Sequence, residues 1–154
     1  MPKMSKLLPE DTVHIDIADW DTDGEDLKMV RTAVFIDEQN VPVELEWDDS
    51  DRNCTHFIVR TGNRTGNSAI ATARLTSEGQ IGRMAVLADY RGLGIGAALL
   101  ENIIYYAKQS GFNKLWLHAQ TRAVVFYEKH DFISEGDEFM DANIKHRAMY
   151  KYLD

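Results

Sequence analysis

The sequence predicts a mixed α/β fold, with helices packed on the faces of a central mixed sheet, and two observations indicate it. Two strand-type runs, 56–60 and 69–75, flank the turn-forming residues 62–67, which predicts an antiparallel hairpin. The strand-type run 80–87 then leads through a glycine-rich turn into a long helix and a short strand at 114–119. Such a crossover requires parallel, right-handed pairing, so the sheet must contain both strand directions.

The elements before the hairpin are expected to be a strand, a helix and an acidic loop. Residues 12–17 alternate apolar and polar side chains, which predicts a strand. The helix that follows has three candidate N-caps: Asp21, Thr22 and Asp23. Its apolar side chains recur at helical spacing: Leu27, Val30, Val34 and Phe35. Residues 37–53 are expected to be irregular because Pro42 interrupts any long helix there. Their acidic run 44–51 is expected to be a solvated loop.

The elements after residue 87 alternate helices and strands. The long helix carries Ile95, Leu99, Ile103 and Ala107 on one face, and Gly111 ends it. The strand at 114–119 should have Trp116 and His118 on one face, buried as is usual inside a sheet. The remaining elements are expected to be a helix over 121–129 and strands over 132–134 and 145–152.

Bulk properties exclude several classes of function. The 154 residues are expected to form one domain, and the net charge of −8 argues against nucleic acid as a partner. The same charge fits a cationic substrate such as an amine. No apolar stretch is long enough to cross a membrane and no signal peptide is visible, which predicts a cytoplasmic protein without a membrane partner. Cys54 is the single cysteine, and no histidine pair has metal spacing, so we expect no disulfide and no metal.

The turn from Arg91 to Gly96 is the most informative segment. A strand ends before it, three glycines occupy alternate positions within it, and a helix begins at once. The first N–H groups of a helix lack partners inside the helix and lie at the positive end of its dipole. Glycines allow an anion to approach those groups closely, and Arg91 adds a forked cationic donor. The turn therefore predicts a phosphate-binding site.

Three other interpretations compete with this one. A plain turn needs no ligand, but three glycines cost much conformational entropy for a connection alone. A Walker loop requires Lys-Ser/Thr after the last glycine, where Ala97-Ala98 stands, so it is excluded. The pattern Gly92-x-Gly94-x-x-Ala97 fits the Rossmann fingerprint, which also expects a carboxylate at the end of the next strand. Here that strand ends in His-Ala-Gln at 118–120.

Four segments resemble the GNAT acetyltransferases, in the family's order. The turn Arg91-x-x-Gly94-x-Gly96 resembles the family's pyrophosphate loop. Residues 125–132, Val-Phe-Tyr-Glu-Lys-His-Asp-Phe, are similar to the F-Y-x-x-x-G-F segment. Two further segments resemble the ElaA/YjcF-like branch: residues 34–42 follow V-F-x-x-E-Q-x-x-P, and residues 138–146 follow E-F-x-D-x-x-I-x-H.

The sequence departs from the family at two places. Asp131 stands where the family usually has glycine before Phe132, so the turn must close differently or hold Asp131 in the left-handed region, which aspartate tolerates better than most residues. Many members carry asparagine at the start of the fourth helix, where Gln120 and Thr121 stand here, which puts one cofactor hydrogen bond in question.

The resemblance implies a fold and a co-substrate. It implies a single GNAT domain over 1–154, with a sheet of six to seven strands splayed between strands four and five. It implies acetyl-CoA, whose pyrophosphate lies on the glycine turn and whose pantetheine arm pairs like an extra strand in the splay. The residues implied in cofactor binding are Met84, Ala85, Val86, Arg91, Gly92, Leu93, Gly94, Ile95, Gly96, Ala97, Gln120, Phe126 and Tyr127.

The resemblance also implies the reaction. An acetyl group would pass from acetyl-CoA to a primary amine, a small molecule or a peptide N-terminus, by direct attack in a ternary complex. A backbone N–H near Ala85 or Val86 would stabilise the oxyanion. Tyr127 is at the family's position for the acid that protonates the thiolate, or it is only a wall residue. His146 is the first candidate for the base, or it only packs. Glu38 is the second, or it binds a cationic substrate or caps a turn.

Two other functions stay open. The chain could be a non-catalytic acyl-CoA-binding module, or a transferase that uses a longer acyl donor. The sequence does not identify the acceptor, because a fold does not determine a substrate. It also leaves open the choice between His146 and Glu38 as base, and whether the protein is a homodimer.

Overall fold

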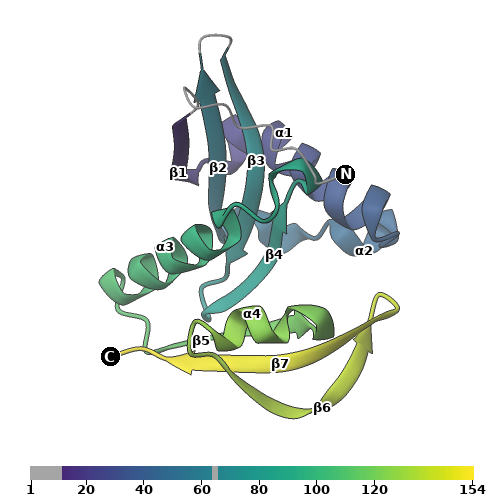
Figure 1. Cartoon of the computed structure of the whole chain (residues 1–154), viewed down its shortest axis with the longest axis vertical. Coiled ribbons are helices and arrows are strands. Elements are labelled where there is room, and N and C mark those ends of the chain that lie inside the picture. Colours follow the sequence, from purple (N-terminus) through teal and green to yellow (C-terminus); the bar gives the residue numbers. More distant parts are fainter. Residues whose placement is uncertain (1–11, 64–65) are drawn as a thin grey trace.

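The computed structural model describes residues 12–63 and 66–154, which form one seven-stranded mixed sheet with helices on both faces (Figure 1). The strands lie side by side in the order β1-β2-β3-β4-β5-β7-β6. Their bounds are Thr12–Ala18 for β1, Thr55–Asn63 for β2, Gly66–Leu75 for β3, Gln80–Val86 for β4, Lys114–Gln120 for β5, Ile133–Asp141 for β6 and Ile144–Tyr152 for β7. The predicted α/β class and mixed sheet of six to seven strands are confirmed.

The first four strands form an antiparallel half-sheet. The predicted hairpin is present as β2 and β3, which pair from Thr55↔Leu75 onward; residues 64 and 65 of its turn lie outside the described residues. The register of β3 against β4 shifts between Thr72 and Arg74, and Arg83 of β4 takes a φ of 49° there. A non-glycine residue in this left-handed region is typical of a bulge, which bends the strand.

β4 and β5 run parallel but separate almost at once. Two residue pairs, Gln80↔Trp116 and Ile81↔Leu117, join them. β4 then continues along β3 as far as Val86, whereas β5 continues along β7 as far as Gln120. Among the described residues no strand therefore covers the edge of β4 that faces β5 beyond Ile81. The two halves of the sheet diverge in Figure 1, as the predicted splay between strands four and five requires.

The last three strands form the second half-sheet. β7 pairs with β5 along the full length of β5, and with β6 in a hairpin closed by Ala142 and Asn143. These two residues have φ values of 51° and 63°, as a two-residue turn of type I′ requires. β6 is much longer than the predicted strand at 132–134. As an edge strand it is largely exposed, so its sequence shows no apolar alternation beyond Ile133.

Helices cover both faces of the sheet (Figure 1). Leu27 and Val30 pack on one face, and Leu99 and Ile103 pack in the larger core on the other. The bounds are Trp20–Arg31 for α1, Thr32–Glu38 for the π-helix η1, Val43–Glu46 for α2, Asp49–Asn53 for η2, Ala88–Tyr90 for η3, Ile95–Gln109 for α3, Thr121–Ala123 for η4 and Val124–Glu128 for α4. Within the described ranges, none of these helices combines the length and apolarity needed to cross a membrane.

The start of α1 corrects one prediction. The N-cap is Asp19, two residues before Asp21, the first of the three expected caps. The Asp19 carboxylate accepts the N–H groups of Asp21 at 2.8 Å and Thr22 at 3.2 Å. Several adjacent aspartates can cap a helix, and packing of Trp20 and Leu27 decides which one does, because it fixes the rotation of the helix.

The acidic run before β2 is only partly the solvated loop that was expected, because Glu44, Asp48 and Asp49 are exposed but two other carboxylates are buried. Glu46 and Asp51 are only 2% and 3% exposed, and both bind Arg31, which is 1% exposed, at 2.8 and 2.9 Å. Arg74 binds Asp51 as well, at 2.8 Å. Burial alone would raise the pKa of Asp51, but hydrogen bonds from Arg31 and Arg74 hold that pKa below its usual value. A cationic partner makes a buried carboxylate tolerable.

Candidate active site

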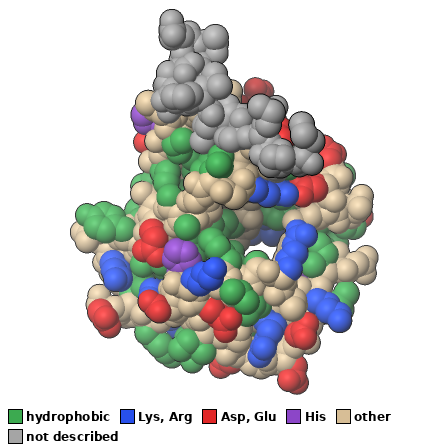
Figure 2. Space-filling view, viewed as in Figure 1, with side chains coloured by type: hydrophobic (Ala, Val, Ile, Leu, Met, Phe, Trp, Pro, Cys, Tyr) green, Lys and Arg blue, Asp and Glu red, His purple; other side chains and the backbone are tan. Residues whose placement is uncertain are grey.

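A cavity of about 720 Å³ lies where β4 and β5 separate. Its walls come from the end of η1, α2, β4 and the start of α3 on one side, and from β5, α4 and the β6–β7 hairpin on the other. The space-filling view is hollowed near its centre, with basic side chains beside the hollow (Figure 2). The predicted site residues that line the cavity are Met84, Ala85, Val86, Arg91, Gly96, Gln120, Phe126, Tyr127 and His146.

The glycine turn lies beside this cavity and faces open space. Gly92 and Gly94 have φ values of 78° and 81°, and a Cβ at either position would meet no atom within 4 Å. Gly94 supplies no side-chain cap to α3, whose first backbone bond runs from the N–H of Ala98 to Gly94 at 3.0 Å. The amides before Ala98 are therefore free of helix bonds at the positive end of α3. An open cradle of this kind fits a diphosphate.

The other predicted residues of the turn differ in exposure. Gly92, Leu93, Gly94, Ile95 and Ala97 do not line the cavity. Ile95 is 6% exposed and belongs to the larger core, whereas Leu93 is 41% exposed. The side chain of Ile95 thus anchors the helix, and only its backbone N–H remains available to a ligand. Gly96 approaches Phe126, because a Cβ there would lie 3.7 Å from the Phe126 ring.

Arg91 and Glu38 are predicted for separate roles, but the structure joins them. The Arg91 guanidinium donates to both carboxylate oxygens of Glu38, at 2.6 and 2.7 Å. Its Nε donates to the carbonyl of Val86 at 2.9 Å. The hydrogen bond to Glu38 raises the pKa of Arg91. The Arg91 guanidinium that was predicted to bind phosphate is thus bound to a carboxylate. Glu38 does not itself line the cavity, but it contacts Arg91, which does.

Tyr127 lies on α4 and reaches across the cleft to β4. Its hydroxyl is 3.6 Å from Sδ of Met84, and its ring packs edge-to-face on Phe126 and Phe132. Burial raises the pKa of Tyr127 to about 12. The phenol therefore stays protonated at neutral pH and can donate a proton or a hydrogen bond into the cavity. Asp131, which stands where the family usually has glycine, has a φ of 68°. Of the two predicted alternatives, the turn after α4 therefore holds this aspartate in the left-handed region.

His146 lies on β7 with its ring held in a fixed orientation. Its Nδ1 is 2.7 Å from the carbonyl of Ile144, which can only accept, so Nδ1 carries the proton. The ring stacks on Phe139 with centroids 5.9 Å apart, and the residue is 9% exposed. In the neutral ring the lone pair is consequently on Nε2, the position from which a histidine accepts a proton.

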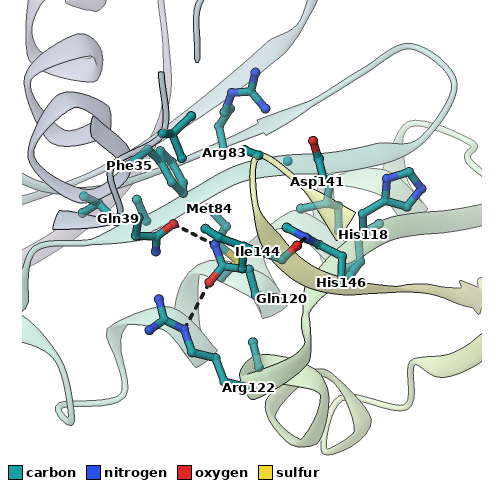
Figure 3. Close-up of a pocket in the computed structure, with 18 of the residues that line it drawn as sticks. Phe35, Gln39, Arg83, Met84, His118, Gln120, Arg122, Asp141, Ile144 and His146 are labelled. Atoms are coloured by element: carbon teal, nitrogen blue, oxygen red, sulfur yellow. Dashed lines mark hydrogen bonds between the residues drawn. The ribbon is translucent and has the colours of Figure 1, made fainter. Parts of the chain in front are cut away.

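Gln120 does not lie free for a cofactor in this structure. Its amide nitrogen donates to Oε1 of Gln39 at 2.8 Å, and its amide oxygen accepts from Nε of Arg122 at 3.1 Å (Figure 3). Gln39 follows η1, so this bond bridges the two halves of the sheet. Gln39 was missed as a site residue, although it adjoins Glu38 in the branch-like segment at 34–42.

His118 corrects the expectation of burial. It is exposed, it lines the cavity, and its ring packs edge-to-face on Phe139 with centroids 4.9 Å apart. Leu115 and Leu117 face the core, whereas His118 points to the opposite face of β5, which no helix of the described ranges buries. Two further cavity residues were missed, Arg83 and Asp141. Across the described residues, no group of three His, Cys, Asp or Glu side chains could hold a metal ion.

Comparison with known proteins agrees with this fold and cleft. A family model described as an acetyltransferase (GNAT) domain matches residues 26–153. The N-acetyltransferase YjcF of Bacillus subtilis, whose activity is uncharacterised, is 34% identical over 82% of this chain and 91% of its own length. The chain therefore belongs to the GNAT acetyltransferase family, in its ElaA/YjcF-like branch, and is an acyltransferase.

Two solved structures share the fold. The crystal structure of Escherichia coli ElaA superposes with a TM-score of 0.78 at 20% identity, covering 91% of this chain and 99% of ElaA. Naa50 of Arabidopsis thaliana superposes with a TM-score of 0.70 at 23% identity, covering 92% of this chain and 99% of Naa50.

Proposed function

We propose that this protein is an N-acetyltransferase that moves the acetyl group of acetyl-CoA to a primary amine in a ternary complex. One observation carries the proposal. A strand edge without a partner at Met84–Val86 and the hydroxyl of Tyr127 meet in one cleft, and the open glycine turn at Gly94 lies directly beside that cleft. A phosphate-bearing thioester with an extended amide arm fits those three features together.

The chain's own residues would hold acetyl-CoA in four ways. The amides of Ile95, Gly96 and Ala97 would bind the diphosphate at the start of α3. Arg91 would add charge once its fork is shared between Glu38 and the ligand. The exposed edge of β4 would pair with the amide arm as a strand does, since the backbone groups there lack a neighbouring strand. Phe126 and Tyr127 would form the wall on the α4 side.

The proposed chemistry uses a base on β7, His146, and an acid on α4, Tyr127. Nε2 of His146 takes a proton from the ammonium form of the acceptor, and the neutral amine then attacks the thioester carbonyl. The carbon–nitrogen bond forms as the carbon–sulfur bond breaks, with a backbone N–H near Ala85 or Val86 on the oxyanion. Tyr127 gives the proton that the departing thiolate needs, and the proton that the acetylated nitrogen must then lose restores the phenol of Tyr127.

The contacts of Glu38 argue against the alternative base. Both of its carboxylate oxygens accept hydrogen bonds from Arg91, which stabilises the ionised carboxylate and lowers its basicity. The ring of His146 has one nitrogen bound to Ile144 and the other available to a substrate. We therefore assign the base to His146 and no part in proton transfer to Glu38.

A primary amine is the acceptor class that this arrangement supports. Arabidopsis Naa50 was solved with the bisubstrate analogue CoA-Ac-MVNAL, so a relative of this fold binds CoA and an acceptor as one unit. In this chain the cavity extends past His146 toward the β6–β7 hairpin, with room for an acceptor beside the proposed thioester position.

Thiol release from acetyl-CoA, measured over a panel of small amines, polyamines and peptide N-termini, tests the proposal. Turnover with at least one amine, together with a higher Tm in the presence of acetyl-CoA, is the expected result. A higher Tm without thiol release from any amine would indicate an acyl-CoA-binding module instead. Faster release from propionyl-CoA or butyryl-CoA than from acetyl-CoA would move the donor to a longer acyl group.

A further inference from the structure

Asp141 is a carboxylate at the mouth of the cavity that the proposed chemistry does not use. It ends β6, next to the two-residue turn at Ala142 and Asn143, and its side chain is exposed. Asp141 lines the cavity, yet its carboxylate makes no hydrogen bond or ion pair with the described part of the chain. An ionised carboxylate in such a position is available to a cation from outside the protein.

The strand register fixes where Asp141 lies relative to His146. Asp141 pairs with Ile144, and Phe139 pairs with His146, so Asp141 and His146 are diagonal neighbours on one face of the hairpin. Diagonal neighbours of an antiparallel pair have Cα atoms about 7–8 Å apart. In Figure 3 the Asp141 carboxylate is drawn apart from the His146 ring. When the reacting nitrogen of the acceptor lies at Nε2 of His146, Asp141 is therefore available to a different group of the same acceptor molecule.

The charges along the cavity favour a cation at this end. Glu46 is paired with Arg83 at 3.1 Å, and Arg91 is paired with Glu38. Arg122, bound through Nε to Gln120, lies at the opposite end of the view in Figure 3 from Asp141. Among the described residues no cation forms a salt bridge with Asp141, so this end of the cavity carries an unpaired carboxylate, in a protein with a net charge of −8. A charge of this kind attracts and orients a cationic ligand.

We propose that Asp141 binds a second cationic group of the acceptor, so that the preferred acceptor is a diamine or another amine with a positive charge several methylenes from the reacting nitrogen. The inference rests on the proposed function, since it takes His146 as the place of the reacting amine. Asp141 then favours amines that carry a second positive charge, and His146 takes the proton from the nitrogen that reacts.

Binding to the CoA complex tests this without requiring turnover. Calorimetric titration of the CoA-saturated protein compares 1,5-diaminopentane with 1-aminopentane, which lacks the second nitrogen. We expect the wild-type protein to bind the diamine about three- to fivefold more tightly, as one exposed charge pair provides. Asp141→Asn should remove most of this preference. Asp137→Asn, on the same strand but outside the cavity, should retain it. Equal weakening of both amines by Asp141→Asn, or no preference in the wild type, would overturn the inference.

Turnover with the same two amines separates this inference from the proposed function. Acetylation of both amines with equal kcat/KM in the wild type and in Asp141→Asn overturns the role of Asp141 and leaves the proposed function standing. Preferential binding of the diamine through Asp141 without thiol release from any amine supports the role of Asp141 and overturns the proposed function. Faster acetylation of the diamine, lost in Asp141→Asn, supports both.

Discussion

The guanidinium of Arg91 and the carboxylate of Glu38 form a two-pronged ion pair across 53 residues of sequence, with distances of 2.6 and 2.7 Å. Glu38 ends η1 and Gln39 follows it, and Gln39 binds Gln120 at the end of β5. Two consecutive residues therefore contact the glycine turn on one side of the cleft and β5 on the other. A ligand that binds Arg91 therefore contacts the same guanidinium that Glu38 binds at the end of η1.

Glu38→Gln should tighten CoA binding about two- to fivefold, because Arg91 would no longer be shared with a partly exposed carboxylate. Calorimetric titration with CoA measures the change. Asp37→Asn, an exposed neighbour outside the cavity, is the matched control. Weaker CoA binding in Glu38→Gln would show instead that Glu38 holds Arg91 in its binding position.

Gly94→Ala should weaken CoA binding about tenfold, because a methyl group would project into the open space of the proposed phosphate cradle. Gly111→Ala is a close control. Gly111 lies just beyond the other end of the same helix, with a φ of 85° and equally open space around its Cβ. Both variants should lose about 1 kcal/mol of stability to the left-handed backbone. If CoA affinity falls equally in both, the cradle is not at Gly94.

Tyr127→Phe should lower kcat about 100-fold while CoA still binds, since the variant lacks the proton donor but keeps the ring. The pKa of about 12 implies that the wild-type rate shows no loss from this group below about pH 10. A raised pKa stabilises the fold below the unfolded value near 10, and that contribution is lost as the pH rises toward 12. The Tm of the wild type should therefore fall more steeply than that of Tyr127→Phe in this range.

The control for Tyr127→Phe is Tyr105→Phe, which removes a hydroxyl from a residue that is 65% exposed on α3. Its kcat and its Tm at high pH should match those of the wild type. An unchanged kcat in Tyr127→Phe would reduce Tyr127 to a wall residue.

His146→Gln should lower kcat/KM at neutral pH by about 100-fold or more, because the acceptor would lose its base. The rate of the variant should recover as the pH rises, since the amine then loses its proton to solvent. Initial rates between pH 7 and pH 10 measure this. His14→Gln, exposed on β1 and distant from the cavity, serves as control. A larger loss in Glu38→Gln than in His146→Gln would return the role of base to Glu38.

Arg31→Met should destabilise the protein by about 3–5 kcal/mol, because Glu46 and Asp51 would lose a cationic partner that is buried with them. Urea unfolding measures the loss. Arg52→Met removes an ion pair whose side chains are 71% and 79% exposed, so its unfolding midpoint should stay close to that of the wild type. A similar midpoint in both variants would contradict the structural importance of the buried cluster.

Local patterns predicted the backbone of this protein well. Alternation at residues 12–17 and the glycine turn before α3 each depend on neighbours in sequence, and the structure contains both the strand and the turn. The turn-forming residues 62–67 predicted the hairpin, but strand pairing extends into that segment, as far as Asn63↔Gly66. The resemblance supplied the splay, which no single strand encodes. β6 was predicted too short, because an exposed edge strand needs no apolar face.

Side-chain partnerships were the part that sequence could not supply. The sequence around Arg91 does not indicate that Glu38 forms an ion pair with it. The sequence around Gln120 likewise does not indicate a hydrogen bond to Gln39, 81 residues away. The burial of Arg31 with Asp51 is another case, since isolated charges read as surface residues until their partners are found. These pairings arise when elements pack, and they determine which predicted site residues are free to act.

The early separation of β4 from β5 has a consequence for solubility. A strand edge with free backbone groups usually invites another chain to add to it, which is the first step toward aggregation. Here the edge beyond Ile81 opens into a cleft between two half-sheets rather than onto the outer rim of the sheet. An edge inside a cleft is less accessible to a second sheet than an edge on the outer rim, so the same geometry favours a slender extended molecule over edge-to-edge self-assembly.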